Sequence, residues 1–237
     1  HASCFRLYQD LVKEIRAEDL IVESPVIHLY KKEEDYKGAL SIWKILKDKG
    51  IEFEELDEPL VREKEPNLSS DYQFWVLFRN SGFSSNPFRL VEKMSERFLS
   101  DGGDFIHESV KKIKPEDQEN ITLKLENREI QSERLLVAAG AWSHQLASQL
   151  GVKIPLETER GYHVTLNSKE GGPQNIVMEA AHKFMATPME MGVRFAGTAE
   201  FAGLKTPANQ TRAEILLKLG KKMYPQLEDG ESSDWMG

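Results

Sequence analysis

The sequence predicts a mixed fold of helices and strands, α+β in class with α/β-like stretches, organised as two interleaved domains. Apolar residues recur at helical spacing in several segments. Other short segments alternate polar and apolar residues, or are rich in β-branched and aromatic residues, as strands are. Both kinds of segment alternate along all 237 residues instead of separating into halves, and a chain of this length can form one large domain or two small ones.

The first eighty residues are expected to form an opening helix and the first part of a sheet domain. Residues 5–15 and 36–49 place apolar side chains on one helical face, and the second helix ends at Gly50. In that helix we expect Ile42, Ile45 and Leu46 to face inward. The other predicted segments are an extended stretch at 21–30, a short strand at 51–56, an acidic, proline-bearing connection at 57–68 and a buried strand at 74–78.

The middle of the chain is predicted to be a helix followed by a meander. Asn86 is a good N-cap and Pro87 suits a first helical turn, so we expect a helix from there to Ser100. Short polar breaks then separate three extended segments, which indicates an antiparallel meander. These segments are 104–113, 121–126 and 128–138, and a helix at 143–150 follows with Gly151 as its stop.

The last part of the chain is predicted to be mostly sheet. Extended segments at 160–166, 175–187 and 191–201 are joined by turns that contain glycine or proline, and they indicate a mixed antiparallel sheet. A final helix is expected at 210–224, where Pro225 ends it.

Composition excludes several classes of protein. The net charge of -8 and the pI of about 5.4 argue against a nucleic-acid binder, which usually carries a basic patch. Cys4 is the single cysteine, so an internal disulfide and a cysteine-based metal site are excluded, and a reducing compartment is expected. The sequence has no apolar run of the roughly 20 residues that a transmembrane helix needs, and HASCFRLYQD does not resemble a signal peptide. We therefore expect a cytoplasmic protein.

Residues 135–151 form the segment most suggestive of ligand binding. LLVA is predicted to be a buried strand, AGA has almost no side-chain bulk, and a helix is expected next. Such a turn brings backbone N–H groups close to a ligand, and a helix N-terminus there favours an anion such as a pyrophosphate. A tight strand-to-helix turn without any ligand explains the pattern equally well.

The neighbouring residues add a family resemblance. AAGAWS, followed further along by ERGYHV, resembles the FAD-dependent D-amino-acid dehydrogenase branch of the family that includes glycine, sarcosine and D-amino-acid oxidases. Similar blocks lie in the family's order along nearly the whole chain. They are IEFEELDEPLVREKEPNL, GFSSNPFRLVEKMSERFLSDGGDF, KFMATPMEMGVRFAGTAEFAGL and DWMG.

The resemblance implies part of an FAD-binding, Rossmann-like domain interleaved with a substrate domain that contains a mixed antiparallel sheet. On this basis we expect residues 1–80 to hold the N-terminal helix and the first part of the substrate domain. Residues 81–155 would be part of the FAD domain, and residues 156–237 the second part of the substrate domain and the return toward the FAD domain.

Two family features are missing from the sequence. No GxGxxG turn is present to hold the FAD pyrophosphate, since Gly102-Gly103 and Gly171-Gly172 do not fit that pattern. The family's final loop, which lies against the flavin and helps to hold a substrate carboxylate, would follow DWMG. The chain starts at His1 and stops at Gly237, so we expect an enzyme truncated at both ends with an incomplete FAD site.

The resemblance also implies roles for individual residues. The positions expected to contact FAD are Val110, Ala138, Ala139, Gly140, Trp142 and Gly161. Val110 and Trp142 would otherwise be ordinary buried residues. Tyr162 and His163 are expected to face the substrate, but adjacent strand residues point to opposite sides, so at most one of them does. Thr198 and Glu200 are expected on a sheet surface. No metal ligand is expected, and no residue is identified as catalytic.

The implied reaction is oxidation of the C–N bond of an amino acid, most specifically a D-amino acid, by hydride transfer to FAD. The cofactor carries the difficult chemistry, and the imine hydrolyses to a keto acid and ammonia. Glycine, sarcosine, proline or an opine is the alternative class of substrate, and a folded but inactive fragment is the alternative class of protein. The electron acceptor would be oxygen or a quinone-linked carrier, and in the second case the protein could lie peripherally on the inner face of the membrane.

Overall fold

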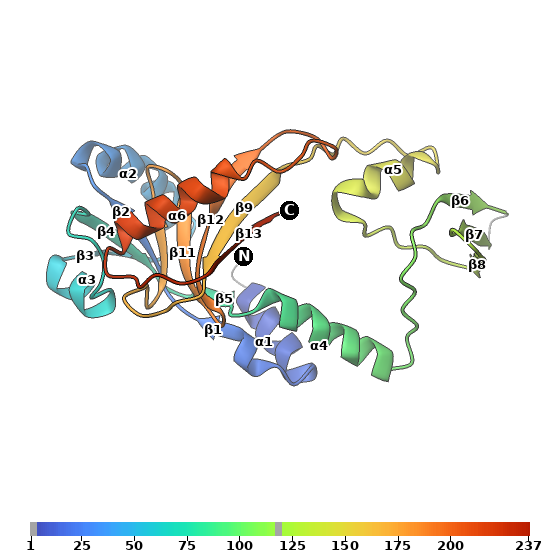
Figure 1. Cartoon of the computed structure of the whole chain (residues 1–237), viewed down its shortest axis with the longest axis horizontal. Coiled ribbons are helices and arrows are strands. Elements are labelled where there is room, and N and C mark those ends of the chain that lie inside the picture. Colours follow the sequence, from blue (N-terminus) through green and yellow to red (C-terminus); the bar gives the residue numbers. More distant parts are fainter. Residues whose placement is uncertain (1–3, 117–119) are drawn as a thin grey trace. The chain divides into compact units, whose positions relative to one another are not determined.

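A computed structural model describes residues 4–116 and 120–237 (Figure 1). The chain divides into two compact units. The sheet unit contains the residues up to 100 together with 161–199 and 208–237, and the inserted unit contains 101–160 and 200–207. The chain passes from one unit to the other and back again, and the structure confirms the predicted mixed α+β class.

An eight-stranded mixed sheet forms the centre of the sheet unit. Its strand order is β13-β9-β12-β11-β10-β2-β4-β3. β2 and β10 pair in parallel, whereas the pairs β13–β9, β12–β11, β11–β10, β2–β4 and β4–β3 are antiparallel. The strands are β2 (Val26–Tyr30), β3 (Phe53–Leu56), β4 (Phe74–Phe78), β9 (Arg160–Leu166), β10 (Ile176–Glu179), β11 (Phe184–Met189), β12 (Gly192–Glu200) and β13 (Ser232–Met236).

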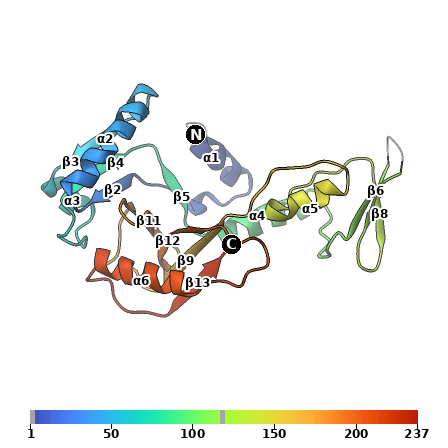
Figure 2. The same ribbon diagram turned by 90° about the horizontal axis from the view of Figure 1, so that it is seen from above.

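Helices cover different parts of the two faces of this sheet. α6 (Thr211–Met223) and α3 (Glu58–Lys64) bury apolar side chains on one face, which we call the α6 face. α2 (Glu33–Asp48) covers the opposite face, the α2 face, over the end formed by β2, β4 and β3. Figure 2 shows α6 and α2 on opposite sides of the strands.

A smaller layer in the same unit is built from the predicted helices near 5–15 and 87–100. These are α1 (Cys4–Glu14) and α4 (Pro87–Ser100), which pack with the 3-10 turn η1 (Glu18–Leu20) around Val12, Leu20 and Leu90. Asn86 caps α4 as predicted, since its side-chain oxygen accepts a hydrogen bond from the backbone N–H of Arg89. β1 (Ile21–Glu23) and β5 (Gly82–Ser84) form a two-stranded ribbon beside this layer.

The inward face of α2 differs from the prediction. Ile42 and Ile45 are 56% and 59% exposed, and of the three predicted residues only Leu46 packs inward. The buried stripe instead follows Tyr36, Ala39, Trp43 and Leu46 at spacings of three and four residues. Trp43 occupies the centre of this stripe because its large ring fills the space over Tyr30 and Phe78, with ring centroids 6.4 and 5.0 Å away.

Two other segments differ from their predictions. The connection at 57–68 contains the helix α3, because Asp57 accepts a hydrogen bond from the backbone N–H of Leu60 and Pro59 fits the first turn. The strand expected at 175–187 is two strands, β10 and β11, joined by a turn at residues 180–183. In that turn the buried Glu179 accepts hydrogen bonds from the backbone and ring nitrogens of His182. The first three residues of DWMG, Asp234, Trp235 and Met236, lie in β13, which pairs with β9.

The inserted unit contains the predicted meander with shorter strands. Its three strands are β6 (Lys112–Pro115), β7 (Ile121–Lys124) and β8 (Glu129–Ser132), paired antiparallel in that order. The predicted strand and helix at 135–150 are only partly present. α5 (Ser143–Ser148) forms, but residues 135–138 are not a strand, and Leu136 is 88% exposed. A strand needs a neighbour for its backbone groups, and no segment among 4–116 and 120–237 pairs with these residues.

A fully buried carboxylate joins three segments of the sheet unit. Glu65, just after α3, accepts hydrogen bonds from the backbone N–H of Asn175 at 2.7 Å and from its side-chain amide at 2.9 Å. The backbone N–H of Gln174 and the hydroxyl of Tyr224 at 2.8 Å complete the set. Burial raises the pKa of Glu65, while these hydrogen bonds act to lower it. The four donors hold the end of α3 against the start of β10 and the end of α6.

We expect Glu65→Gln to lower the free energy of unfolding by about 2–4 kcal/mol, because an amide nitrogen would face donors where the carboxylate oxygens now accept. Urea unfolding followed by circular dichroism measures this loss. Glu63→Gln is the matched control, since Glu63 is exposed. Equal stabilities for the two variants would contradict the proposed importance of the buried network.

Stability should also depend on His28, which packs between Trp43 and Phe78 with ring centroids 5.2 and 4.8 Å away. Burial lowers the pKa of His28 to about 4 from its ordinary 6.5. Between these values the unfolded chain binds more protons than the folded one, so stability falls as pH decreases from 6.5 toward 4. The loss attributable to His28 is at most about 3 kcal/mol.

His28→Phe retains an aromatic ring and removes this titration. We expect the variant to lose less stability than the unmodified protein when urea unfolding is repeated between pH 7 and pH 4. Identical pH dependence in the two proteins would show that His28 does not contribute.

Candidate functional site

The residues predicted to bind cofactor and substrate fall in both units. Val110, Ala138, Ala139, Gly140 and Trp142 belong to the inserted unit. Gly161, Tyr162 and His163 lie together on β9 in the sheet unit.

In the inserted unit, the small-residue turn has a conformation that favours glycine. Gly140 has a φ of +51°, and a 3-10 turn, η2 (Gly140–Trp142), leads directly into α5. The backbone N–H of Trp142 donates to the carbonyl of Ala139 at 3.0 Å. Trp142 itself is 57% exposed, and Val110 is half-buried in an irregular segment. The role of these residues in binding a cofactor stays a prediction.

On β9, adjacent residues have opposite environments. Tyr162 is buried on the α6 face, where its hydroxyl accepts a hydrogen bond from the backbone N–H of Asn209 at 3.1 Å. His163 is half-buried and stacks on Trp235 of β13 with ring centroids 4.9 Å apart. Because the two residues point to opposite sides, His163 is the one that the strand presents on the α2 face.

Two further side chains extend this part of the α2 face. Val193 and Phe195 are buried on the α6 face, so Arg194 between them lies on the α2 face of β12. Its Nε–H donates to the hydroxyl of Thr165 on β9 at 3.3 Å. Gly161, at the exposed start of β9, has open space beside its backbone, since the nearest atom to an added Cβ would be 4.0 Å away.

The surroundings of His163 determine whether its ring is charged. Burial, and secondarily the positive charge of Arg194, lowers the pKa of His163 to about 4. The imidazole is therefore neutral at pH 7. Burial likewise lowers the pKa of Arg194, but a guanidinium stays protonated at any physiological pH. We define the candidate site as Gly161, His163, Thr165, Arg194 and Trp235.

Sequence reasoning identified only Gly161 and His163 among these five residues. Thr165 was inside a predicted strand without an assigned role. Arg194 was detectable as a charged residue between buried apolar neighbours in a strand, a pattern that indicates a two-sided environment. Trp235 was recognised within DWMG, but nothing in the sequence places it beside His163, because their strands pair across 72 positions.

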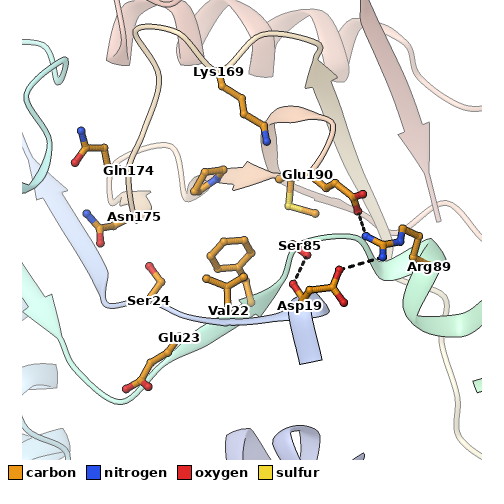
Figure 3. A pocket seen from close by; sticks show the side chains of 13 residues that line it. Asp19, Val22, Glu23, Ser24, Ser85, Arg89, Lys169, Gln174, Asn175 and Glu190 are labelled. Carbon is orange, nitrogen blue, oxygen red and sulfur yellow. Dashed lines mark hydrogen bonds and ion pairs between the residues drawn. The ribbon is translucent and has the colours of Figure 1, made fainter. Parts of the chain in front are cut away.

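A cavity of about 420 Å³ lies beside the turn between β11 and β12, where Pro188, Met189 and Glu190 line it (Figure 3). Arg89 of α4 spans it and donates to Asp19 at 3.0 Å and to Glu190 at 2.8 Å. The hydroxyl of Ser85 donates to the backbone carbonyl of Asp19 at 3.2 Å. Arg89 therefore pairs with both Asp19 and Glu190. These two ion pairs join α4, η1 and the turn between β11 and β12, so we interpret this cavity as a structural junction.

Among residues 4–116 and 120–237, no cluster of three or more histidine, cysteine, aspartate or glutamate side chains could hold a metal ion. In the same ranges, no helix combines the length and the apolar composition required to cross a bilayer.

Comparison with known proteins identifies relatives of the whole chain. A protein-family model described as "DAO: FAD dependent oxidoreductase" matches residues 1–237. The D-amino-acid oxidase of Bradyrhizobium diazoefficiens is 32% identical over 221 residues, which cover 93% of this chain and 52% of that protein. The D-amino acid dehydrogenase of Dechloromonas aromatica is 26% identical over 240 residues, or 97% of this chain and 57% of that protein. The chain thus spans about half the length of these curated relatives.

Solved structures show the same fold. The glycine oxidase of Geobacillus kaustophilus superposes with a TM-score of 0.83 at 19% identity, over 98% of this chain and 64% of that one. The glycine oxidase of Bacillus cereus superposes with a TM-score of 0.81 at 20% identity, over 100% of this chain and 65% of that one. At these identities the similarity establishes the architecture and leaves substrate choice open.

The electrostatic coupling within the site predicts a measurable shift. We expect Arg194→Gln to raise the pKa of His163 above 4, because the repulsive positive charge is removed. The pKa should remain below 6.5, because burial is the larger cause of the lowering. Nuclear magnetic resonance titration of the histidine ring protons measures this value.

Arg79→Gln serves as the control for this titration, since Arg79 pairs with Glu54 at the far end of the sheet. An unchanged pKa of His163 in Arg194→Gln would mean that the two side chains are not coupled.

Proposed function

Because this chain belongs to the FAD dependent oxidoreductase family, we propose that it oxidises the C–N bond of an amino acid, in particular a D-amino acid. The observation that carries this proposal is the match to the D-amino-acid oxidase of Bradyrhizobium diazoefficiens, which extends over 93% of the chain. The D-amino acid dehydrogenase of Dechloromonas aromatica supports the same substrate class. Glycine, sarcosine, proline and opines are the competing substrates.

The residues present fit one side of a flavin site. Gly161 is exposed and has room beside its backbone, so a flat ring can approach β9 there. We propose that Gly161 lies against the flavin, and that Val110, Ala138, Ala139, Gly140 and Trp142 contact the rest of FAD. No GxGxxG turn occurs in the 237 residues, so the pyrophosphate cradle is not among the groups that this chain supplies.

FAD supplies the redox chemistry when it is bound, by accepting the hydride that leaves the α-carbon of the substrate. The amine nitrogen loses a proton to solvent, and water hydrolyses the resulting imine to a keto acid and ammonia. The chain's own contribution is to orient the substrate on the α2 face. His163 is neutral at pH 7 and offers one ring nitrogen as a hydrogen-bond acceptor, while Trp235 holds that ring in place.

The proposal also includes an electron acceptor and a cellular location. Either oxygen or a quinone-linked carrier receives the electrons, and production of hydrogen peroxide distinguishes the two. We propose a cytoplasmic protein, which lies peripherally on the inner face of the membrane if the acceptor is membrane-borne.

A folded module without flavin activity is the second candidate. The observation in its favour is the exposed apolar surface of the inserted unit, where Leu136, Trp142 and Phe105 are all exposed. Such a surface usually contacts another polypeptide segment or a ligand. Flavin binding by the purified protein separates this candidate from the enzyme.

We expect the purified protein to bind FAD weakly, because it supplies no GxGxxG cradle, and to show flavin absorbance near about 450 nm once it is saturated with added FAD. With an artificial electron acceptor, it should then oxidise at least one D-amino acid in a panel that also contains glycine, sarcosine and proline. Protein that stays colourless with added FAD would support the inactive module. Turnover of glycine, sarcosine or proline alone would instead replace the D-amino acid as substrate.

The position assigned to the flavin can be tested on β9. We expect Gly161→Val to weaken FAD binding by about tenfold or more, since a branched side chain would occupy the space open to the ring. Ser232→Val on the edge strand β13 is the matched control, because Ser232 is exposed and pairs with Leu166 at the other end of β9. Fluorescence titration with FAD measures both affinities, and equal affinities would remove Gly161 from the flavin site.

A further inference from the structure

The backbone of Thr198 has an unfavourable conformation. Its φ is +59°, in the left-handed region. The other described non-glycine residues with a positive φ lie in turns or bends, and they are Arg16, Asn80 and Lys183. Thr198 lies instead in strand β12, and its side chain is β-branched, which makes this conformation costly. A strained residue of this kind persists only where the surrounding structure imposes it, and such residues are concentrated at functional sites.

The hydroxyl of Thr198 adds a second cost. Its oxygen is buried and has no hydrogen-bond partner within residues 4–116 and 120–237. The residue as a whole is only half-buried, so other atoms of Thr198 reach the surface. Because no hydrogen bond holds the hydroxyl inside, a change of rotamer can exchange it with the methyl group without breaking one. A glycine would avoid both costs, so local stability does not account for a threonine here.

Strand β12 contains one more residue than the part of β9 beside it. Near one end of the pair, Arg194 of β12 donates to Thr165 of β9. Near the other end, Arg160 of β9 lies 3.7 Å from Glu200 of β12. The two strands therefore run antiparallel. From one contact to the other, the chain advances five residues on β9 and six on β12. One extra residue on one strand of a pair is a β-bulge.

The left-handed φ places this bulge at Thr198, because one common type of bulge has a residue in that conformation. Counted from the two contacts, Thr198 lies beside Gly161 and Tyr162. Neighbouring strands are about 5 Å apart, so the hydroxyl of Thr198 is within reach of a ring that lies on Gly161. Bulges are frequent next to active sites, where they redirect a side chain.

A flavin ring needs hydrogen-bond partners along its polar edge. This edge carries carbonyl oxygens and ring nitrogens, and hydrogen bonds to them are among the contacts by which proteins bind the cofactor. A threonine hydroxyl both donates and accepts, so it can pair with either kind of group. Gly161 leaves room for the ring, since the nearest atom to an added Cβ would be the carbonyl oxygen of Gly237 at 4.0 Å.

We propose that Thr198 is a flavin-contacting residue, whose hydroxyl turns outward and forms a hydrogen bond with the polar edge of the ring that lies against Gly161. The cofactor then provides the partner that the hydroxyl lacks inside the sheet unit. This inference rests on the proposed function, because it requires a flavin ring at Gly161.

Thr198→Val retains the shape of the side chain and removes the hydroxyl. We expect this variant to bind FAD about tenfold more weakly, because one hydrogen bond to the ring is lost. Without FAD, its Tm should be about 2–4 °C higher than that of the unmodified protein, because a methyl group replaces a buried hydroxyl without a partner. A purely structural role would change the Tm and leave the affinity for FAD unchanged.

Thr198→Ser retains the hydroxyl and should bind FAD nearly as tightly as the unmodified protein. Thr198→Ala removes the hydroxyl as well and repeats the test if the valine variant does not fold. Thr187→Val is the matched control, because Thr187 lies on β11 opposite Arg194 and not beside Gly161. Fluorescence titration measures the affinities, and thermal unfolding followed by circular dichroism measures the Tm. Equal affinities of Thr198→Val and the unmodified protein for FAD would overturn the proposal.

Riboflavin identifies the part of the cofactor that Thr198 contacts, because it has the same ring and lacks the pyrophosphate. We expect Thr198→Val to weaken the binding of riboflavin and of FAD by the same factor. A loss confined to FAD would overturn the contact with the ring. If the unmodified protein binds neither flavin, the proposed function and this inference both fail. Flavin binding and turnover of an amino acid, with equal affinities in the two proteins, would overturn this inference alone.

Discussion

In both β9 and β12, every second residue is buried under α6. The intervening residues of each strand therefore lie on the opposite face of the sheet. Tyr162 and Phe195 contribute to the apolar core, so His163 and Arg194 are brought to the α2 face by the strand geometry itself. A shift of register by one residue would exchange these sets and expose the core. The candidate site therefore depends on the same packing that stabilises the sheet.

The buried Glu65 network has a complementary role at another part of the sheet. Its partners come from α3, the start of β10 and the end of α6, which are far apart in the sequence. Because all donors are satisfied by one carboxylate, the position of α6 over the strands is tied to that of β10. This helix is the one that covers β9 and β12, so the network stabilises the layer on which the site rests.

The α2 face contains groups whose charges are set by partial burial. His163 is neutral, Arg194 is positive and has no acid partner among residues 4–116 and 120–237, and Trp235 provides a flat apolar surface. That composition agrees with a family in which the cofactor performs the redox step.

Local sequence patterns determined most helices and strands, because amphipathic spacing and N-caps act over a few residues. They also indicated the family through AAGAWS and ERGYHV. Only the tertiary structure could show that residues 135–138 are not a strand, since a strand requires a neighbour. Likewise, only strand pairing brings Trp235 to His163, and only packing under α6 decides which side of β12 carries Arg194. Those contacts join distant segments, and short-range sequence patterns do not encode them.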